Sequence, residues 1–201
     1  MSHSYQTIVK EGNSVHRVLA SKHLGFALAI RDEQQAKEWI KLFRTKYHDA
    51  NHVCYAYRCG ITDVQRHSDD GEPSGTAGKP IAGAILSFQI TQVLVIVVRY
   101  FGGTKLGTGG LIQAYKTAAT MAIEDAGVVE KRWQRKVEIV CNYAQLPELM
   151  NILKQRQAEK QSIVQEEDCR LTYVVAEEQL TEMQAAVSAI GPMVIHLGEL
   201  I

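Results

Sequence analysis

Residues 93–110 read Val93-Leu-Val-Ile-Val-Val-Arg-Tyr-Phe-Gly-Gly-Thr-Lys-Leu-Gly-Thr-Gly-Gly110. The six residues at the start form a continuous apolar run, which is typical of a central strand. A glycine-rich loop follows, and Thr108 is predicted to cap a long helix that ends before Gly127. Apolar residues repeat along two adjacent faces of this helix, so we expect it to be well buried.

A second glycine-rich block precedes the strand and reads Ser68-Asp-Asp-Gly-Glu-Pro-Ser-Gly-Thr-Ala-Gly-Lys-Pro80. Thr76 is predicted to open a short apolar helix that runs through Phe88, with Pro80 in its first turn. More than half of the 15 glycines fall between residues 71 and 110. Because glycine loses the most conformational freedom on folding, two such blocks around one strand predict a shaped backbone surface and a functional site. The alternative is two tight connections in a compact domain.

The residues before these blocks predict two strands, at 14–20 and 24–30, and then a helix. Asp32 is the expected helix cap, with Gln35 as its capping-box partner. An apolar stripe follows at helical spacing, formed by Ala36, Ile40, Phe43 and Tyr47. Residues 53–59 are predicted to form a strand, and residues 61–75 a polar loop.

Residues 136–201 contain a complete pattern of their own. Strands are predicted at 136–142, 162–165, 170–175 and 193–197. One helix is expected at 146–156 and a second from Leu180 to the Gly191-Pro192 stop. The order β-α-β-β-α-β is that of a ferredoxin-like domain. We therefore divide the chain into domains at 1–133 and 136–201.

Length and composition fit a protein of one large or two small domains. The 201 residues are 46% hydrophobic, which is ordinary for a globular protein. No apolar run approaches the ~18–20 residues of a membrane span, and the first five residues do not resemble a signal peptide. The four cysteines form neither a Cys-x-x-Cys pair nor a zinc spacing. We expect buried free thiols, a cytoplasmic location and no membrane partner.

The net charge of zero conceals an asymmetry. Residues 1–135 carry an excess of five basic side chains, and residues 136–201 carry an excess of five acidic ones. A mildly basic first part is compatible with an anionic partner. It falls short of the balance of dedicated nucleic-acid binders.

Neither of two common phosphate-binding motifs is complete. Gly78-Lys79 lacks the earlier glycine and the following Ser or Thr of a Walker A loop. Gly107-Thr-Gly109 is followed by Ile112 where a dinucleotide fingerprint needs its third glycine. The sequence thus predicts no nucleotide cofactor, and we assign none of any other kind.

A more general anion site remains, because both glycine blocks run into helix starts that expose N–H groups. Arg99, Lys105 and the helix start at Thr108 are expected to converge on one anionic group. The candidate anion- or partner-binding residues are Lys79, Arg99, Tyr100, Gly102, Gly103, Lys105, Gly107, Gly109 and Gly110. The supporting loop contains Asp69, Asp70, Gly71, Glu72, Gly75, Thr76 and Gly78. Alternatively, the threonines only cap their own helices, and Arg99 is buried against Asp70 or Glu72.

Acidic and sulfur-bearing residues offer further chemistry. Asp69, Asp70 and Glu72 could hold a hard cation or act as an acid/base pair, or could simply be turn residues. His52 and Cys54 lie two apart on a predicted strand and so share a face. A core thiol beside a hydrogen-bonded histidine is favoured there over a metal site. With no nucleophile–base pair evident, we assign no catalytic residue and no metal ligand.

Residues 69–80 and 98–111 resemble the two hallmark motifs of the IMPACT family, in its bacterial YigZ-type branch (UPF0029). Further matches are Ser21-Lys22, Asn51-His-Val-Cys-Tyr-Ala-Tyr57 and Tyr115. The resemblance covers most of residues 14–127, and residues 136–201 are similar to the branch's smaller C-terminal domain by position and pattern. His23 stands where the family usually has an aromatic residue, most often Phe.

The resemblance implies an α+β fold of two domains. The N-terminal βαβ domain would be similar to domain 2 of a small-subunit ribosomal protein, and the ferredoxin-like C-terminal domain to domain V of elongation factor G. The implied function is a non-enzymatic cytoplasmic regulator linked to translation or stress response. Its partner would be RNA, the ribosome or a translation-associated protein, held at the glycine-rich loops. The alternative is a hydrolase-type enzyme that uses a divalent metal on a small phosphorylated or peptide substrate. The oligomeric state stays open.

Overall fold

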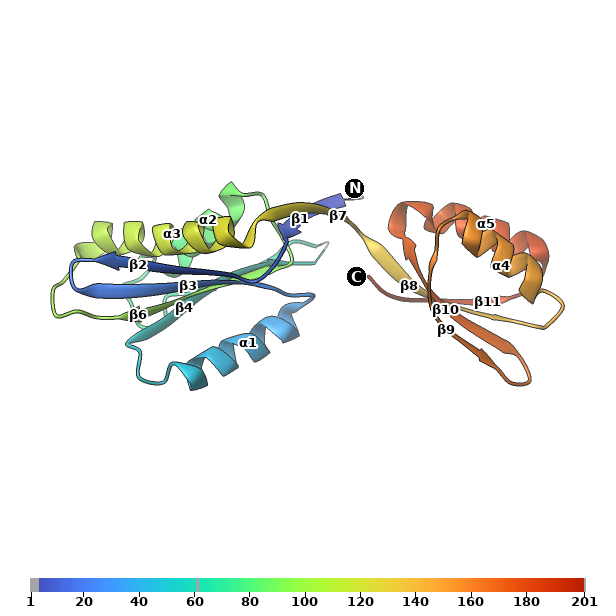
Figure 1. The fold of residues 1–201 in the computed structure, drawn as a ribbon, viewed down its shortest axis with the longest axis horizontal. Coiled ribbons are helices and arrows are strands. Elements are labelled where there is room, and N and C mark those ends of the chain that lie inside the picture. Colours follow the sequence, from blue (N-terminus) through green and yellow to red (C-terminus); the bar gives the residue numbers. More distant parts are fainter. Residues whose placement is uncertain (1–3, 61, 201) are drawn as a thin grey trace. The chain divides into compact units, whose positions relative to one another are not determined.

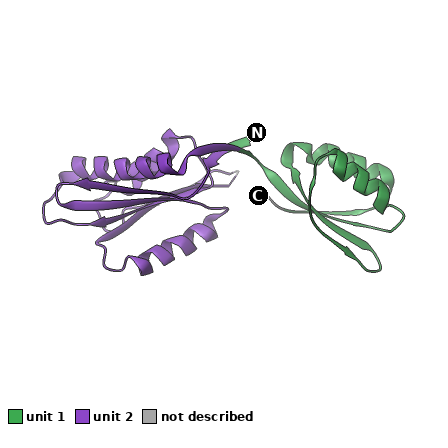
Figure 2. Cartoon of the chain, viewed as in Figure 1, with its two compact units in different colours: residues 1–5, 131–201 green, residues 6–130 purple. Residues whose placement is uncertain are grey.

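A computed structural model of the chain describes residues 4–60 and 62–200. It divides into two compact units, shown in different colours in Figure 2. One unit comprises residues 6–130, and the other comprises residues 131–200 together with residues 4 and 5. Both contain helices and strands, so the fold is α+β as predicted. Independent folding of 1–133 and 136–201 stays a prediction.

The larger unit is built on one five-stranded sheet, here called the large sheet. Its strands follow the order β2 (Gly12–Val18), β3 (Ser21–Ala29), β6 (Val93–Tyr100), β4 (His52–Cys59) and β5 (Val64–Ser68). All neighbouring strands are antiparallel. Three helices cover it: α1 (Glu33–Lys46), α2 (Gly78–Ser87) and α3 (Gly107–Ala126). Figure 1 shows α1 on one face of the sheet and α2 with α3 on the other.

The central position of β6 explains its unbroken apolar run. Val93, Val95 and Val97 pack into the core beneath α2 and α3. The alternate residues, Leu94, Ile96 and Val98, pack into the second core beneath α1. A strand covered by helices on both faces needs apolar residues at every position rather than at alternate ones.

Two strand glycines allow α3 to lie very close to the large sheet. A Cβ added at Gly12 would come within 2.1 Å of the Ala122 carbonyl oxygen, and one at Gly25 within 2.5 Å of the Ala118 carbonyl oxygen. The Ser14 hydroxyl donates to the same Ala118 carbonyl at 2.7 Å. This close approach fixes where α3, and with it the loop before α3, meets the sheet.

The predicted elements of this unit recur with small shifts in their bounds. Asp32 Oδ1 accepts from the Gln35 N–H at 2.7 Å, as the capping box requires. The reciprocal bond differs, because Gln35 Oε1 accepts from Arg31 rather than from Asp32. Gly127, after α3, has the positive φ (67°) that suits a glycine exit.

The predicted polar loop at 61–75 is wrong over Val64–Ser68, which form β5 and pair with β4. This edge strand is mostly exposed and shows no apolar alternation, so only its pairing reveals it. Ile61 lies outside the described residues. Two further strands that the sequence does not predict, β1 (Ser4–Ile8) and β7 (Val128–Arg132), form a two-stranded sheet.

The smaller unit has the predicted order β-α-β-β-α-β. Its elements are β8 (Gln134–Cys141), α4 (Leu146–Gln155), β9 (Glu159–Gln165), β10 (Cys169–Ala176), a short 3₁₀ turn (Glu177–Gln179), α5 (Leu180–Ile190) and β11 (Val194–Leu200). The sheet order is β11-β8-β10-β9, and α4 and α5 cover one face of it (Figure 1). The ferredoxin-like prediction is confirmed.

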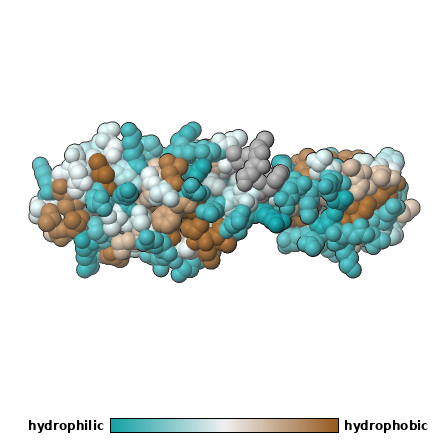
Figure 3. Space-filling view, turned by 90° about the horizontal axis from the view of Figure 1, so that it is seen from above, coloured by the Kyte–Doolittle hydropathy of each residue, from teal (hydrophilic) through white to brown (hydrophobic). Residues whose placement is uncertain are grey.

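Surface hydropathy, the cysteines and helix length also bear on the sequence-based expectations. Figure 3 shows apolar side chains in patches between hydrophilic ones over residues 6–130. Cys54, Cys59, Cys141 and Cys169 are free and buried, as predicted. Across the part of the chain that the structure describes, no helix is long and apolar enough to cross a bilayer.

Candidate functional site

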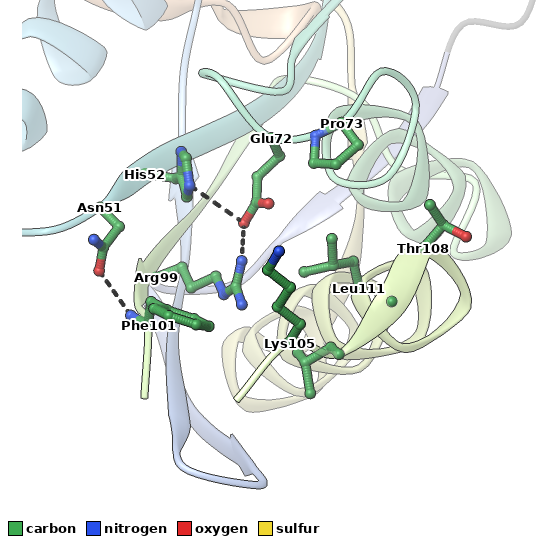
Figure 4. Close-up of a pocket in the computed structure, with 11 residues that line it drawn as sticks. Asn51, His52, Glu72, Pro73, Arg99, Phe101, Lys105, Thr108 and Leu111 are labelled. Atoms are coloured by element: carbon green, nitrogen blue, oxygen red, sulfur yellow. Dashed lines mark hydrogen bonds and ion pairs between the residues drawn. The ribbon is translucent and has the colours of Figure 1, made fainter. Parts of the chain in front are cut away.

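A pocket of about 440 Å³ lies where the loop between β6 and α3 meets the loop after β5 (Figure 4). It is lined by Asn51, His52, Glu72, Pro73, Arg99, Phe101, Lys105, Leu106, Gly107, Thr108 and Leu111. Of the residues predicted from the sequence, Arg99, Lys105, Gly107 and Glu72 lie together here. The two glycine blocks therefore face a common cavity.

Asp69 holds the loop after β5 in shape. Its Oδ2 accepts from the Gly75 N–H at 2.8 Å, and its Oδ1 accepts from the N–H groups of Ala77 and Gly78. Burial raises the pKa of Asp69, but these three backbone hydrogen bonds outweigh it and the net pKa is lowered. A carboxylate from the preceding turn thus caps the start of α2.

Thr76 precedes α2 but does not cap it, against the alternative in which this threonine only caps its own helix. The N-cap residue of α2 is Ala77, and the Thr76 hydroxyl donates to the Pro73 carbonyl at 2.6 Å. The reason is that Asp69 already accepts from the N–H groups at this helix start, so the threonine closes the preceding turn instead.

Asp70 ties the same loop to the large sheet and to α1. Its Oδ2 accepts from the Val53 N–H, and its Oδ1 accepts from Arg44 Nη2, both at 2.7 Å. Its backbone carbonyl lies 2.8 Å from His52 Nδ1. Because a carbonyl only accepts, His52 Nδ1 carries the hydrogen and Nε2 faces the pocket.

Cys54 contacts the loop from the same face of β4 as His52. Its thiol donates to the Asp69 carbonyl at 3.0 Å and lies 3.4 Å from the Tyr115 hydroxyl. Burial and nearby carboxylates raise the pKa of this thiol well above its usual range, so it stays protonated. The preferred interpretation, a core thiol beside a hydrogen-bonded histidine, is confirmed.

Glu72 is the centre of a buried polar cluster on the pocket wall. Its Oε1 accepts from Arg99 Nη1 at 2.6 Å and from the Tyr115 hydroxyl at 2.8 Å. His52 Nε2 lies 3.8 Å from the same oxygen, which makes an ion pair when that imidazole is protonated. Glu72 Oε1 is therefore held by a permanent cation, Arg99, and by the Tyr115 hydroxyl.

Arg99, near the end of β6, is buried and paired, as the alternative to an anion-binding cation held. Its side chain is only 6% exposed, and its partner is Glu72 rather than Asp70. Nη2 makes one long contact, 3.5 Å, with the Ser21 hydroxyl. Within the described residues, the buried Nε has no hydrogen-bond partner. The guanidinium also lies 5.4 Å from the ring centre of Phe101.

The start of α3 forms the opposite wall of the pocket. Its N-cap residue is Leu106, and within the described chain no side chain caps it. The prediction that Thr108 caps this helix is therefore wrong, because the N-cap lies two residues earlier and Thr108 lines the pocket. The free N–H groups and the helix dipole leave partial positive charge here.

Lys105 adds a full charge to that wall. It is exposed, and Figure 4 shows its side chain directed towards the space beside Arg99 and Glu72. No ion pair involves it among the residues that the structure describes. With Glu72 already neutralised by Arg99, the remaining electrostatics of the pocket are positive.

The other predicted site residues serve the backbone or lie elsewhere. Lys79 is exposed on the first turn of α2, outside the pocket lining. The Tyr100 hydroxyl donates to Asp49. A Cβ at Gly102 or Gly78 would clash with the backbone of Ala20 or Ser68, whereas Gly109 has open space around it and Gly110 faces Leu106. Gly71, Gly75, Gly103 and Gly107 adopt positive φ values.

The sequence analysis did not single out several lining residues. Asn51 Oδ1 accepts from the Phe101 N–H at 2.7 Å and so joins the start of β4 to the end of β6. Both residues fall inside segments that carry the family resemblance, and this resemblance is the feature of the sequence that could have identified them as site residues. Leu106, Leu111 and Pro73 supply apolar lining that no local pattern identifies.

The carboxylates suggested for metal or acid/base chemistry do not converge. Asp69 and Asp70 direct their oxygens at backbone N–H groups and Arg44, while only Glu72 lines the pocket. In the described part of the chain, no group of three His, Cys, Asp or Glu side chains is arranged to hold a metal ion. The pocket's chemistry is that of a cationic cavity with one buried, neutralised acid.

Comparison with known proteins is consistent across sequence and structure. Residues 19–123 match the family model for the Impact N-terminal domain. The chain is 35% identical over 158 residues to the IMPACT family member YvyE of Bacillus subtilis, covering 78% of this chain and 73% of that protein. It is 35% identical over 125 residues to the IMPACT family member YigZ of Escherichia coli, covering 61% of each. A crystal structure titled as that of a hypothetical protein matches 99% of both chains with a TM-score of 0.75 and 25% identity.

Proposed function

The chain belongs to the IMPACT family, and we propose that it acts as a regulator linked to translation or stress response by binding RNA. The bound group is a backbone phosphate of a single RNA strand, held in the pocket between the start of α3 and the loop after β5. Family membership supports a translation-related role in general. The assignment to RNA comes from the chemistry of the pocket.

The observation that carries this proposal is the combination of unpaired positive groups on the pocket wall. The start of α3 presents free N–H groups, and an exposed lysine, Lys105, stands beside it. Helix N-termini bind phosphate through such groups. On the opposite wall Arg99 neutralises Glu72, so no unpaired acid opposes these positive groups.

An exposed aromatic ring favours a nucleotide over a free anion. Phe101 is 43% exposed at the pocket edge, and its N–H is fixed by Asn51. Proteins that bind single strands combine a cationic track with aromatic faces on which bases stack. A phosphate at Lys105 with a neighbouring base on Phe101 uses both features of the pocket.

The test is fluorescence anisotropy with a labelled trinucleotide RNA at about 50 and about 200 mM salt. Lys105→Gln should weaken binding at the lower salt concentration and reduce the salt slope by about 0.7, as expected for one contact with single-stranded RNA. Phe101→Leu should weaken binding roughly fivefold or more through lost stacking. Lys116→Gln is the matched control, because Lys116 is exposed on α3 outside the pocket.

Two results would overturn the proposal. One is a wild-type protein that binds no RNA at the lower salt concentration. The other is equal affinity of Lys105→Gln and Lys116→Gln. Near-ultraviolet circular dichroism of both variants serves as the folding control.

A further inference from the structure

A second basic groove lies beside helix α1. It has a volume of about 420 Å³ and is lined by Lys37, Ile40, Lys41, Arg44, Thr45 and Tyr55. The three cations recur at helical spacing and so share one face of α1. Two of them contact carboxylates: Lys37 lies 3.5 Å from Glu33, and Arg44 lies 2.7 Å from Asp70.

These contacts leave much of the positive charge available. The side chains of Lys37 and Arg44 are 62% and 51% exposed, so their ion pairs are weak and open to competition. Lys41 is exposed, and among the described residues no ion pair involves it. The lining itself contains no acidic side chain.

The groove adjoins the pocket through a single residue, Asp70. Its carboxylate accepts from Arg44, which lines the groove, and its carbonyl accepts from His52, which lines the pocket. The two cavities therefore lie on either side of this loop. Arg44 in the groove is thus linked to His52 in the pocket through Asp70.

The floor of the groove distinguishes between anionic partners. Tyr55 is half-buried and lies parallel to Tyr57, with ring planes 8° apart and ring centres 6.3 Å apart. Ile40, a largely buried core residue, adds an apolar side chain to the lining. A cationic rim above an aromatic floor fits phosphates and bases together, whereas an acidic peptide uses the rim alone.

We propose that the groove formed by Lys37, Lys41, Arg44 and Tyr55 is a second subsite for a single RNA strand. It continues the strand whose phosphate is bound in the pocket, and so this inference rests on the proposed function. The consequence is a dependence on length: a strand long enough to reach the groove binds more tightly than one that fills only the pocket.

The experiment compares a trinucleotide RNA with a roughly 12-nucleotide single strand. The double variant Lys37→Gln/Lys41→Gln should lose affinity for the longer strand, with a salt slope lower by about 1.4, and bind the trinucleotide as wild type does. Tyr55→Leu should weaken binding of the longer strand roughly fivefold or more. The matched control is Lys116→Gln/Lys154→Gln, which removes the same charge from other exposed positions.

Each outcome has a distinct meaning. If the control and the groove variant bind the longer strand equally while Lys105→Gln still weakens the trinucleotide, the groove is overturned and the pocket stands. If neither RNA binds the wild type, the proposed function itself fails. If a polyglutamate of equal charge competes as well as RNA and Tyr55→Leu has no effect, the partner is an acidic peptide and the RNA subsite is overturned. Trp39 fluorescence in a Trp133→Phe background reports whether α1 stays folded in the variants.

Discussion

Arg99 Nη1 lies 2.6 Å from Glu72 Oε1, and both side chains are almost completely buried. The pair joins the central strand β6 to the loop after β5, 27 residues apart in the chain. It therefore fixes the pocket wall while leaving that wall without a net charge of its own. The remaining positive charge comes from Lys105 and the start of α3.

Breaking this pair from either side should be costly. Arg99→Met leaves a buried carboxylate, and Glu72→Gln leaves a buried guanidinium, so each should lower the free energy of unfolding by about 3–5 kcal/mol. Urea unfolding followed by Trp39 fluorescence in a Trp133→Phe background measures this, because Trp39 is then the only tryptophan and lies on α1. The double variant Arg99→Met/Glu72→Gln should lose less than the two single changes together. Additive losses would show that the pair does not act as a unit.

His23 should make the larger unit sensitive to acid. It is fully buried on β3, and within the described residues neither ring nitrogen has a hydrogen-bond partner. Burial, then the charges of Arg99 and His16, lower its pKa to about 4 although Glu72 raises it. The unfolded chain binds the proton near pH 6.5, so stability falls as the pH drops from about 6.5 towards 4, by at most about 1.4 kcal/mol per pH unit.

His23→Phe should remove that part of the pH dependence. It should also raise the free energy of unfolding at about pH 7 by about 1–2 kcal/mol, because no buried polar group is left unsatisfied. The edge-on contact with Tyr115, with ring centres 5.2 Å apart, can be retained by a phenyl ring. Urea unfolding across this pH range in the same tryptophan background is the measurement. An unchanged slope would mean that His23 finds a partner in solution.

Asp69 should contribute to stability as a helix cap does. Asp69→Ala should cost about 0.5–2 kcal/mol, and Asp69→Asn less, since the amide oxygen still accepts. The pKa of the folded-state carboxyl is lowered, so its contribution is present above pH ~3.9 and is lost as the pH falls through the folded value. The difference between wild type and Asp69→Ala should thus shrink below about pH 4. A difference that is constant with pH would contradict a capping carboxylate.

The two alanine substitutions Gly25→Ala and Gly83→Ala should act in opposite directions. A Cβ at Gly25 would meet the Ser14 hydroxyl at 2.4 Å and the Ala118 carbonyl at 2.5 Å, so overpacking should cost about 1–3 kcal/mol. Gly83 lies on the exposed side of α2 with nothing within 4 Å of its added Cβ. Alanine there should stabilise by about 0.5–1 kcal/mol. Thermal unfolding of both variants measures the two changes in stability. If Gly25→Ala and Gly83→Ala changed the melting temperature equally, the close contact between α3 and the large sheet would be rejected.

Local patterns in the sequence were sufficient for the elements that carry a strong period. The apolar run Val93–Val98, the stripe along α1 and the β-α-β-β-α-β order of residues 136–201 are confirmed. These signals are reliable because backbone geometry alone decides which residues share a face. β5 was missed because an exposed edge strand has only one hydrogen-bonded neighbour and no buried face to impose a pattern.

The sequence by itself determined that two glycine blocks with basic residues flank one buried strand. The structure places four residues of these blocks, Arg99, Lys105, Gly107 and Glu72, in one pocket. Only the tertiary structure decided what each charge does. Arg99 is neutralised by a residue 27 positions away, and Asp69 caps N–H groups six to nine positions further on. Charge type is a property of a residue. Its burial and its partner depend on how distant segments fold against each other, and no local pattern records that.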